Sequence, residues 1–317
     1  MMAEEARDDD EIFVYMGGDQ RVPDGVRRAR IHKSVKIVPA RAFYNRRQLI
    51  YVEFHDDIEI IEKLAFYGCY SLRGNIKLLG VKIVKEAAFQ FCHGVTDVEF
   101  GDMLEIIEEF AFNSCRALKN IKMPSVRTIR EFAFGHGSEL SDVEFGEELE
   151  TLQEGAFFNC PKLKRIALPL KDDNMIGDYV FGECPMLTTV DMVGGIHNTV
   201  ASLYLESWRN EMTDEINRIN QVLPTITGEE TRAIQRWMRS VIDRLDRYKT
   251  EHKRVLKEAT TLLELVLWKA KLSDNGGDEG EGVRTVGEVE RAREEVRVTS
   301  GADVVIKNVL PFLLLKY

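Results

Sequence analysis

Phenylalanine recurs along the first two thirds of the chain at intervals of 22 to 24 residues. The recurring residues are Phe43, Phe66, Phe89, Phe112, Phe134, Phe157 and Phe181. An aliphatic residue stands five positions before each of them, and an Ala directly precedes six of the seven. Self-similarity at such a period is typical of a solenoid, in which each repeat forms one turn of the chain.

Each repeat also contains one short segment in which apolar and other residues alternate. Six residues after the Phe comes a Leu or Val, followed by an apolar, any, apolar triplet such as Val98–Phe100 or Val143–Phe145. This alternation predicts a short strand with two side chains in the core. One unit cannot bury its apolar side alone, whereas stacked units bury columns worth about 1.5 to 3 kcal/mol per side chain. We therefore expect an α+β protein: a solenoid of about seven repeats with short parallel strands, followed by a helical hairpin or coiled-coil tail.

The consensus Ile-x-x-x-Ala-Phe-x-x-Cys-x-x-Leu-x-x-Val resembles the repeat of BspA-type leucine-rich repeat proteins over about residues 35–193. The resemblance implies a curved solenoid whose relatives mostly bind other macromolecules, and it carries over no catalytic residues. The departures are Arg46 and Gly137 at the Cys position and one extra residue before Ile76. Two end segments, Phe13–Gly18 and Val304–Pro311, are similar to the ends of a group of such proteins in diatoms.

All five cysteines stand three residues after a repeat Phe: Cys69, Cys92, Cys115, Cys160 and Cys184. The repeat therefore explains them as a buried column, and the closely spaced ligand pairs of a zinc site are absent from the sequence. Stacked strands lie about 4.8 Å apart, within disulfide range, but the odd number of cysteines favours reduced thiols that pack in the core. We expect neither a metal nor a cofactor.

Charged residues alternate in sign from one repeat to the next. One column lies between the paired apolar residues of the strands: Glu53, Lys77, Glu99, Lys122 and Glu144. Two further columns are Lys36, Glu59, Lys82, Glu105, Arg127 and Glu150, and Glu62, Lys85, Glu108 and Arg130. In a stack this places each acid between two bases, at about 0.2 to 1 kcal/mol per exposed pair. We interpret the columns as mainly structural and expect a binding surface where the alternation fails.

The alternation fails at both ends of the array. The N-terminal side carries eight basic residues: Arg27, Arg28, Arg30, Lys33, Lys36, Arg41, Arg46 and Arg47. The far end reads Lys171, Asp172, Asp173 and Asn174. The basic cluster has two interpretations: the solvated face of an N-terminal cap that includes the strand-like Ile12–Tyr15, or a patch for nuclear import or an acidic partner.

Two helix-forming runs follow the repeats, separated by Pro224. The second begins with the capping-box sequence Thr227–Glu230 and continues to Leu272, which corresponds to about 67 Å of helix. Its heptad face consists of Ile234, Met238, Val241, Leu245, Val255, Leu262 and Val266. Tyr248 and His252 make the middle of that face less apolar. We predict a hairpin with the shorter helix; a coiled-coil homodimer, or a helix of another protein, is the alternative.

These patterns divide the chain into five segments. They are an acidic N-terminus and cap at 1–34, the solenoid at 35–198, a two-helix region at 199–272, an acidic flexible linker at 273–282 and a short helical segment at 283–317. The apolar end, Val304–Leu315, is too short to span a bilayer. It is expected to dock on the tail helices, insert peripherally into a membrane or serve as a short partner motif.

Composition excludes some functions. The 53 acidic and 43 basic residues give a net charge of -10, which disfavours free-standing nucleic-acid binding. No apolar run is long enough for a transmembrane helix, and the acidic start is unlike a secretory signal. We expect a cytoplasmic protein, with the nucleus as the alternative.

Catalytic motifs are also missing from the sequence. It has no phosphate loop and no nucleophile elbow, and its six His do not share a repeat position. We predict a non-catalytic intracellular module that binds protein through the repeats, with the tail as a second contact or an oligomerisation element. The alternatives are a structural coiled-coil oligomer with the repeats as spacer and, less favoured, a surface adhesin. The sequence assigns no partner-binding residues.

Overall fold

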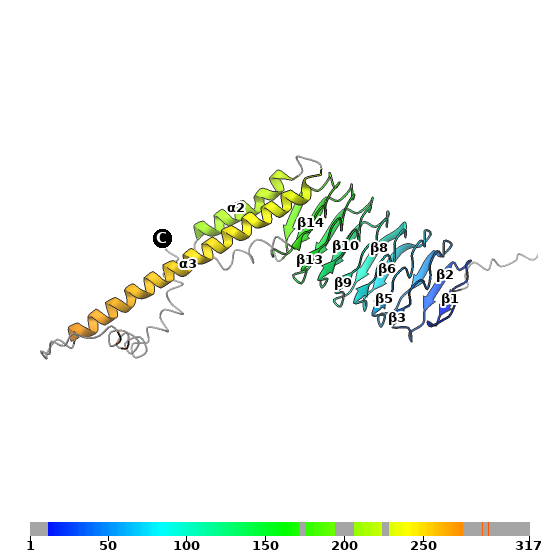
Figure 1. Cartoon of the computed structure of the whole chain (residues 1–317), viewed down its shortest axis with the longest axis horizontal. Coiled ribbons are helices and arrows are strands. Elements are labelled where there is room, and N and C mark those ends of the chain that lie inside the picture. The colour runs from blue at the N-terminus through cyan, green and yellow to red at the C-terminus, as the bar shows by residue number, and fades with distance from the viewer. Residues whose placement is uncertain are drawn as a thin grey trace, which may run out of the picture. The chain divides into compact units, whose positions relative to one another are not determined.

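The structure, a computed structural model, describes residues 12–171, 175–193, 206–223 and 228–274, and residues 287 and 291 (Figure 1). The chain divides into two compact units, residues 1–196 with 216–242 and residues 197–215 with 243–317. The acidic N-terminus, Asp172 to Asn174, and most of the segments expected at 273–282 and 283–317 lie outside the described residues.

Parallel strands join each repeat to the next, which confirms the predicted solenoid (Figure 1). The main sheet has six strands: β6 Arg73–Leu78, β8 Gly94–Phe100, β10 Asn120–Met123, β12 Asp142–Phe145, β14 Arg165–Leu168 and β15 Thr189–Met192. A second sheet consists of two-residue strands: β3 Ile37–Val38, β5 Ile60–Ile61, β7 Ile83–Val84, β9 Ile106–Ile107, β11 Thr128–Ile129 and β13 Thr151–Leu152. A three-stranded sheet begins the array: β1 Ile12–Tyr15, β2 Arg28–Ile31 and β4 Tyr51–Glu53.

The strand pattern follows the alternation in the sequence. In β8, Val98 and Phe100 are buried while Glu99 between them is exposed. The extra residue before Ile76 is accommodated between β6 and β8, where the pairing register shifts at Gly74 and Asn75. Gly74 has φ +85°, a conformation that suits glycine at a bulge. The irregularity is therefore local, and pairing continues in the next repeats.

The segment that carries each repeat Phe is an irregular turn. In the third repeat, Ala87 and Phe91 have φ of 52° and 64°, so left-handed residues stand on both sides of Phe89. Such a residue other than glycine costs about 1 to 2 kcal/mol. Hydrogen bonds offset this cost, since the Phe89 amide donates to the Ala111 carbonyl at 2.7 Å and the Phe91 amide to Asn113 at 3.0 Å. The turns thus form a second backbone ladder along the array.

The core is a stack of phenylalanine rings. All seven repeat Phe are buried, and neighbouring rings stack with centroids between 4.8 and 5.9 Å apart. The ring of Tyr15 on β1 contacts Phe43 edge-on at 5.2 Å and closes the N-terminal end of the stack. The N-terminal strand expected at Ile12–Tyr15 therefore extends the core by one aromatic side chain.

The five cysteines form a second buried column, and every thiol is free. Each Sγ donates a hydrogen bond to the carbonyl of the Phe in the repeat before it, as from Cys92 to Phe66 at 3.3 Å and from Cys115 to Phe89 at 3.3 Å. Burial raises the pKa of the Cys69 and Cys115 thiols to about 12. The cysteine thiols therefore act as weak hydrogen-bond donors to backbone carbonyls in the apolar core.

Two helices follow the repeats, α2 Glu206–Val222 and α3 Glu230–Asp274 (Figure 1). In the first unit they cover the last repeat. The Thr231 hydroxyl accepts from the Phe181 amide at 2.8 Å, Asn220 Oδ1 accepts from Val190 at 2.9 Å, and Gln235 donates to the Ile176 carbonyl at 2.8 Å. These bonds occupy backbone groups of the terminal repeat that a further repeat would otherwise satisfy.

The predicted heptad face divides into a buried and an exposed part. Ile234, Met238, Val241 and Leu245 are buried, whereas Leu262 and Val266 are 64% and 63% exposed, and Val255 is half-buried. In the second unit, Trp208 stacks on Tyr248 with centroids 5.0 Å apart, and Arg244 pairs with Glu211 at 2.9 Å. The two helices therefore pair as a hairpin, and the far end of α3 leaves its apolar face open within the part of the chain described.

Candidate interaction surface

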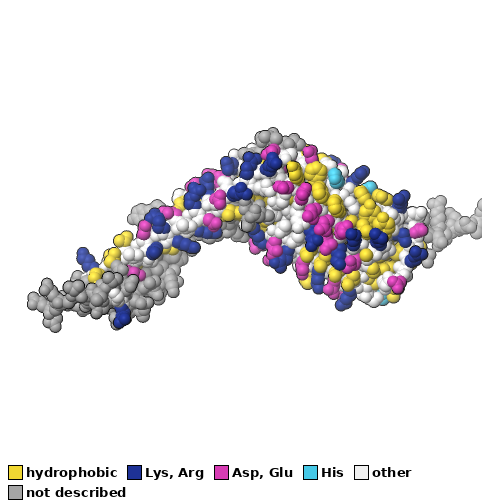
Figure 2. Space-filling view, in the orientation of Figure 1, with side chains coloured by type: hydrophobic (Ala, Val, Ile, Leu, Met, Phe, Trp, Pro, Cys, Tyr) yellow, Lys and Arg dark blue, Asp and Glu magenta, His cyan; other side chains and the backbone are white. Residues whose placement is uncertain are grey.

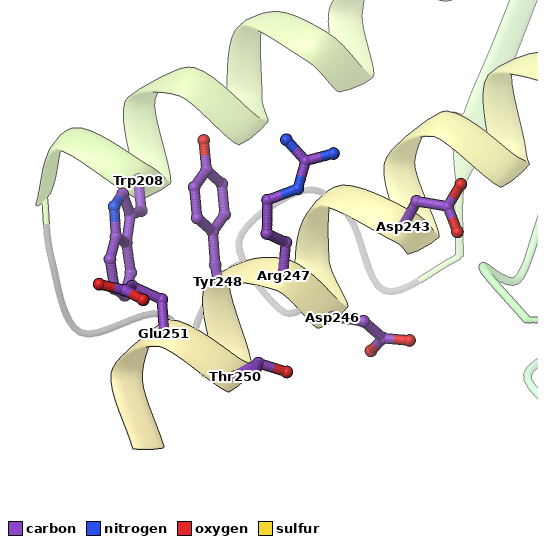
Figure 3. A pocket seen from close by; sticks show the side chains of 7 residues that line it. All are labelled: Trp208, Asp243, Asp246, Arg247, Tyr248, Thr250 and Glu251. Atoms are coloured by element: carbon purple, nitrogen blue, oxygen red, sulfur yellow. The ribbon is translucent and has the colours of Figure 1, made fainter. Parts of the chain in front are cut away.

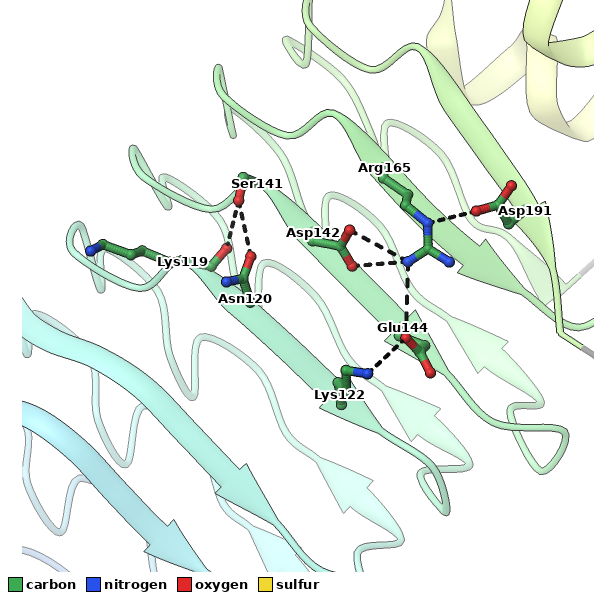
Figure 4. A network of polar contacts seen from close by, with 8 residues as sticks. All are labelled: Lys119, Asn120, Lys122, Ser141, Asp142, Glu144, Arg165 and Asp191. Atoms are coloured by element: carbon green, nitrogen blue, oxygen red, sulfur yellow. Dashed lines mark hydrogen bonds and ion pairs between the residues drawn. The ribbon is translucent and has the colours of Figure 1, made fainter.

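The outer side of the main sheet carries a network of paired charges (Figure 4). Arg165 on β14 bonds to Asp191 through Nε at 2.6 Å and to Asp142 through Nη1 at 3.1 Å. On the neighbouring strands, Lys122 pairs with Glu144 at 3.2 Å. These contacts join four adjacent strands of the sheet, β10 to β15, and leave the carboxylates of this region neutralised by residues of the array itself.

The other charge columns are paired in the same way. Lys82 donates to Glu59 at 2.8 Å and thereby holds the pKa of that carboxylate below its ordinary value. Lys85 donates to Glu62 at 2.7 Å, and Arg127 pairs with Glu150. Figure 2 shows basic and acidic side chains interspersed over the repeats, beside a stretch of hydrophobic ones.

One feature of the expected columns is wrong in detail. We expected every acid to lie between two bases. Glu59 does, because it pairs with Lys36 at 3.9 Å and with Lys82 at 2.8 Å, whereas Glu99 pairs with Lys77 at 3.4 Å and forms no ion pair with Lys122 among the described residues. Likewise, Arg130 pairs with Glu109 at 3.0 Å instead of Glu108. The columns therefore combine separate pairs with residues that bridge two partners, such as Glu59 and Arg165.

A different surface lies on the irregular turns, which we call the turn face. In the N-terminal repeats its aromatic rings touch one another: Tyr44 stacks on Tyr67 at 5.2 Å, Tyr67 meets Phe91 edge-on at 5.5 Å, and Tyr70 lies 5.3 Å from His93. The Tyr70 side chain is 38% exposed. The aromatic residues of the turn face are additional to the buried Phe stack.

Cations adjoin these rings. The guanidinium of Arg41 lies over Tyr44 at 5.7 Å and that of Arg47 over Tyr70 at 5.6 Å. Burial, with a smaller effect of Arg116, lowers the pKa of His93 and favours its neutral form. We name this group the aromatic–basic patch and define it by Arg41, Tyr44, Arg47, Tyr70, His93 and Arg116.

The basic cluster predicted from the sequence splits into paired and unpaired members. Arg30 pairs with Glu53 at 2.6 Å, Lys36 with Glu59 at 3.9 Å, and Arg46 with Asp24 at 3.0 Å. Arg41 and Arg47 belong to no ion pair among the described residues. Part of the cluster is thus bound to neighbouring strands, and part is available on the turn face.

The turn face continues into the C-terminal repeats with a different charge. Phe110 stacks on Phe132 at 5.6 Å and Phe158 meets Phe132 edge-on at 6.1 Å. Phe110 and Tyr179 are 38% and 54% exposed. The residue three positions before the repeat Phe is acidic in each of these turns: Glu109, Glu131, Glu154 and Asp178. The turn face is therefore aromatic throughout, with basic residues among the first repeats and acidic residues among the last.

Sequence reasoning did not identify the turn face. The signal was present as aromatic residues at fixed offsets from the repeat Phe: two before it in Phe110, Phe132 and Tyr179, and one or two after it in Tyr44, Tyr67 and Phe91. Without the turn geometry these positions do not reveal which side they occupy. The left-handed backbone places the rings at the surface beside the buried stack.

An open pocket of about 520 Å³ lies on the helical hairpin (Figure 3). It is lined by Trp208, Asp243, Asp246, Arg247, Tyr248, Thr250 and Glu251. In Figure 3, Tyr248 stands between Trp208 and Arg247, which places two aromatic rings side by side at its centre. Burial raises the pKa of Tyr248, so its hydroxyl stays protonated at neutral pH.

Within residues 12–171, 175–193, 206–223 and 228–274, no three His, Cys, Asp or Glu side chains come together as a set of metal ligands. Over the same part of the chain, no helix combines the length and the apolar character needed to cross a membrane. The surfaces that stand out are therefore the turn face and the apolar far end of α3.

The comparisons with known proteins concern the repeats. The sequence matches the model for the BspA type Leucine rich repeat region, in six copies, over residues 25–124 and 81–207. None of the curated proteins matches this chain.

Several solved structures are similar to it. A leucine-rich repeat protein of T. pallidum is 24% identical with a TM-score of 0.47, over 56% of this chain and 82% of the other. A leucine-rich repeat protein of Bacteroides ovatus is 23% identical with a TM-score of 0.37, over 57% and 49%. A leucine rich cell surface protein of Faecalibacterium prausnitzii is 20% identical with a TM-score of 0.34, over 53% and 61%.

The family match covers the repeats that the structure shows as stacked parallel strands, and its two ranges together span more than half of the chain. The chain belongs to the BspA-type leucine-rich repeat family.

Proposed function

We propose that this protein is a non-catalytic protein-interaction module that binds its partner through the turn face of the repeats. The tail helices cover the last repeat and supply a second contact. Leucine-rich repeats are a fold commonly used for protein interaction. Because the charges on the sheet are already paired within the array, the turn face is the side better suited to bind a partner.

The observation that carries the proposal is the exposure of aromatic side chains that the core does not need. The seven Phe of the stack already fill the interior, yet Tyr70, Phe110 and Tyr179 are 38%, 38% and 54% exposed. Aromatic residues are enriched at protein interfaces, where they supply large contact areas. They recur on one face across the array, in the manner of an extended docking surface.

We also propose the cytoplasm as the compartment. The five thiols are packed as hydrogen-bond donors to carbonyls, which suits a reducing environment. Intact-mass analysis of protein purified under alkylating conditions tests this. Five alkylatable thiols after unfolding support it, and fewer than five, because of disulfides, contradict it.

The test uses two full-length variants that each lose three exposed apolar side chains. The turn-face variant is Tyr70→Asn, Phe110→Asn and Tyr179→Asn, since Asn tolerates the left-handed backbone at 110 and 179. The matched control is Leu262→Asn, Leu265→Asn and Val266→Asn on α3. Both serve as baits in native extract beside the unaltered chain, with retained proteins quantified by mass spectrometry.

We expect the turn-face variant to lose the proteins that the unaltered chain retains, and the α3 variant to keep them. Loss from the α3 variant alone contradicts the proposal. So does equal retention by all three baits. Thermal denaturation of each bait verifies that it is folded.

A structural oligomer is the second candidate, because Leu262 and Val266 on α3 are 64% and 63% exposed. Apolar side chains at heptad positions are typical of a coiled-coil seam. Light scattering on the full chain separates the hypotheses. A dimer that the α3 variant converts to a monomer supports the oligomer, and a monomer in both cases contradicts it.

A further inference from the structure

Two of the three arginines of the aromatic–basic patch lie over tyrosine rings, and none of the three is neutralised by a carboxylate in the described part of the chain. Arg41 and Arg47 stack on tyrosine rings, and neither they nor Arg116 form an ion pair among the described residues. Residues 25–52 contain eight Lys or Arg and no Asp or Glu. A stacked guanidinium keeps its N–H donors free for a carboxylate and loses little conformational freedom when one binds.

Four members of the patch form a row across successive repeats. Arg47, Tyr70, His93 and Arg116 each stand four residues after the Phe of their repeat. Tyr70 lies under Arg47 and beside His93, so the row reads cation, ring, ring, cation. Three steps of about 4.8 Å separate its ends by about 14 Å. An extended peptide covers that distance in about four residues at roughly 3.3 Å per residue.

The middle of the row is apolar. Tyr70 contacts Phe91 with centroids 6.4 Å apart, and Phe91 meets His93 edge-on at 6.1 Å. His93 Nε2 is buried without a hydrogen-bond partner in the part of the chain described. A ligand that fits the row therefore has negative charges at both ends and an aromatic or apolar group between them.

We propose that the aromatic–basic patch binds an extended acidic segment of a partner protein, with two carboxylates about four residues apart and an aromatic residue between them. This inference rests on the proposed function, because it specifies the chemistry of a partner bound by the turn face. Arg47 and Arg116 bind the two carboxylates, and Tyr70 packs against the aromatic side chain.

The ring geometry favours a peptide over single-stranded nucleic acid. Bases bind such proteins by stacking on open ring faces. Here Tyr44 and Tyr67 stack on each other with an interplanar angle of 10°, and Arg47 covers a face of Tyr70. The net charge of -10 for the whole chain also opposes a polyanion.

Fluorescence anisotropy with the full chain tests the inference. The probe is a fluorescein-labelled peptide of nine residues with two Glu four positions apart and a Trp midway, and the control peptide has Gln in place of both Glu. The protein variant is Arg47→Glu with Arg116→Glu. The matched control is Lys119→Glu with Lys164→Glu, which reverses two exposed charges next to strands of the main sheet.

We expect the unaltered chain to bind the Glu peptide at least about tenfold more tightly than the Gln peptide. The Arg47→Glu and Arg116→Glu substitutions remove at least about tenfold in affinity, and the lysine control changes it less than about threefold. Arg47→Gln with Arg116→Gln gives an intermediate loss. Unchanged melting temperatures show that the variants fold.

Three outcomes overturn the inference: no preference for Glu over Gln, equal weakening by the arginine and lysine variants, or tighter binding of a twelve-residue single-stranded DNA than of the peptide. A separate result distinguishes failure of this inference from failure of the proposed function. If the turn-face variant loses captured proteins while the arginine variant retains them, the turn face is the binding surface and the acidic-segment inference fails.

Discussion

The position of a residue within its repeat determines which residues of the neighbouring repeats it contacts. Each of the five inner repeat Phe places its ring between those of the two neighbouring repeats, whereas Phe43 contacts Tyr15 at the N-terminal end of the stack. A Cys three residues later donates to the carbonyl of the preceding repeat's Phe. Where Gly137 replaces the Cys, the position has no side chain to donate this bond.

The thiols are predicted to react only when the protein unfolds. Burial raises the pKa of Cys69 and Cys115 to about 12, so the reactive thiolate is scarce in the folded state. Labelling of the folded chain with Ellman's reagent between about pH 7 and 9 is expected to be far slower than labelling in denaturant, where each thiol has its ordinary pKa near 8.5. Fast labelling of the folded chain that increases with pH would show exposed thiols and contradict the column.

The Phe stack predicts a large difference between two neighbouring positions. Phe112→Ala is expected to cost about 3 to 5 kcal/mol, because the ring is buried between Phe89 and Phe134. Phe110→Ala is expected to cost less than about 1 kcal/mol, because Phe110 is partly exposed. Urea denaturation midpoints of the two variants compare them. Similar shifts for both would mean that the stack does not dominate stability.

At the scale of elements, helix α3 begins on the last repeat through specific polar contacts. Thr231 bonds to the Phe181 amide, and the Glu230 carboxylate accepts from the Gly228 amide at 2.9 Å. Glu230 is only 1% exposed, and its Oε1 lacks a partner among the described residues. The Glu230 side chain therefore fixes the start of the helix, but its burial disfavours the charged form of the carboxylate.

Glu230 predicts a pH-dependent effect on stability. Burial raises the pKa of Glu230, so the folded state binds this proton more tightly than the unfolded state. The stabilisation is present below the unfolded pKa and is lost as the pH rises through the folded pKa. Glu230→Gln is therefore expected to raise the melting temperature at pH 7 more than at pH 4. A difference between variant and unaltered chain that does not change with pH would refute this.

The repeats and their stacking could be predicted from the sequence because the Phe, Leu and strand positions recur at one period. The location of the turn face could not. Tyr70 and Phe110 stand next to buried positions in the sequence, and only the left-handed residues of the turns decide that they reach the surface. The heptad pattern of α3 could not predict which of its apolar residues are buried. Ile234 and Leu262 share the pattern, but only Ile234 is buried.

At the scale of the whole molecule, the repeat array depends on the helices for its C-terminal end. Asn220, Thr231 and Gln235 bond to the backbone of the last repeat, and Ile219 and Ile234 are buried in the same unit. A solenoid whose terminal repeat has no cap exposes its core and its strand edge.

Truncation is expected to reveal this dependence. A chain ending at residue 250 retains the described contacts of the helices with the last repeat and is predicted to remain folded. A chain ending at residue 193 loses them all and is predicted to aggregate or to melt at least about 10 °C lower, since several kcal/mol of burial is removed. Size-exclusion chromatography and thermal denaturation distinguish the two. Equal behaviour of both truncations would show that the helices do not stabilise the array.

Site-specific photo-crosslinking in native extract tests whether the repeats bind a partner through the turn face. A benzophenone amino acid replaces either Tyr70 on the turn face or Leu262 on α3 in the otherwise unaltered full chain. We predict a crosslinked partner protein from position 70. A crosslink from position 262 alone, whether to another protein or to a second copy of the chain, would contradict it.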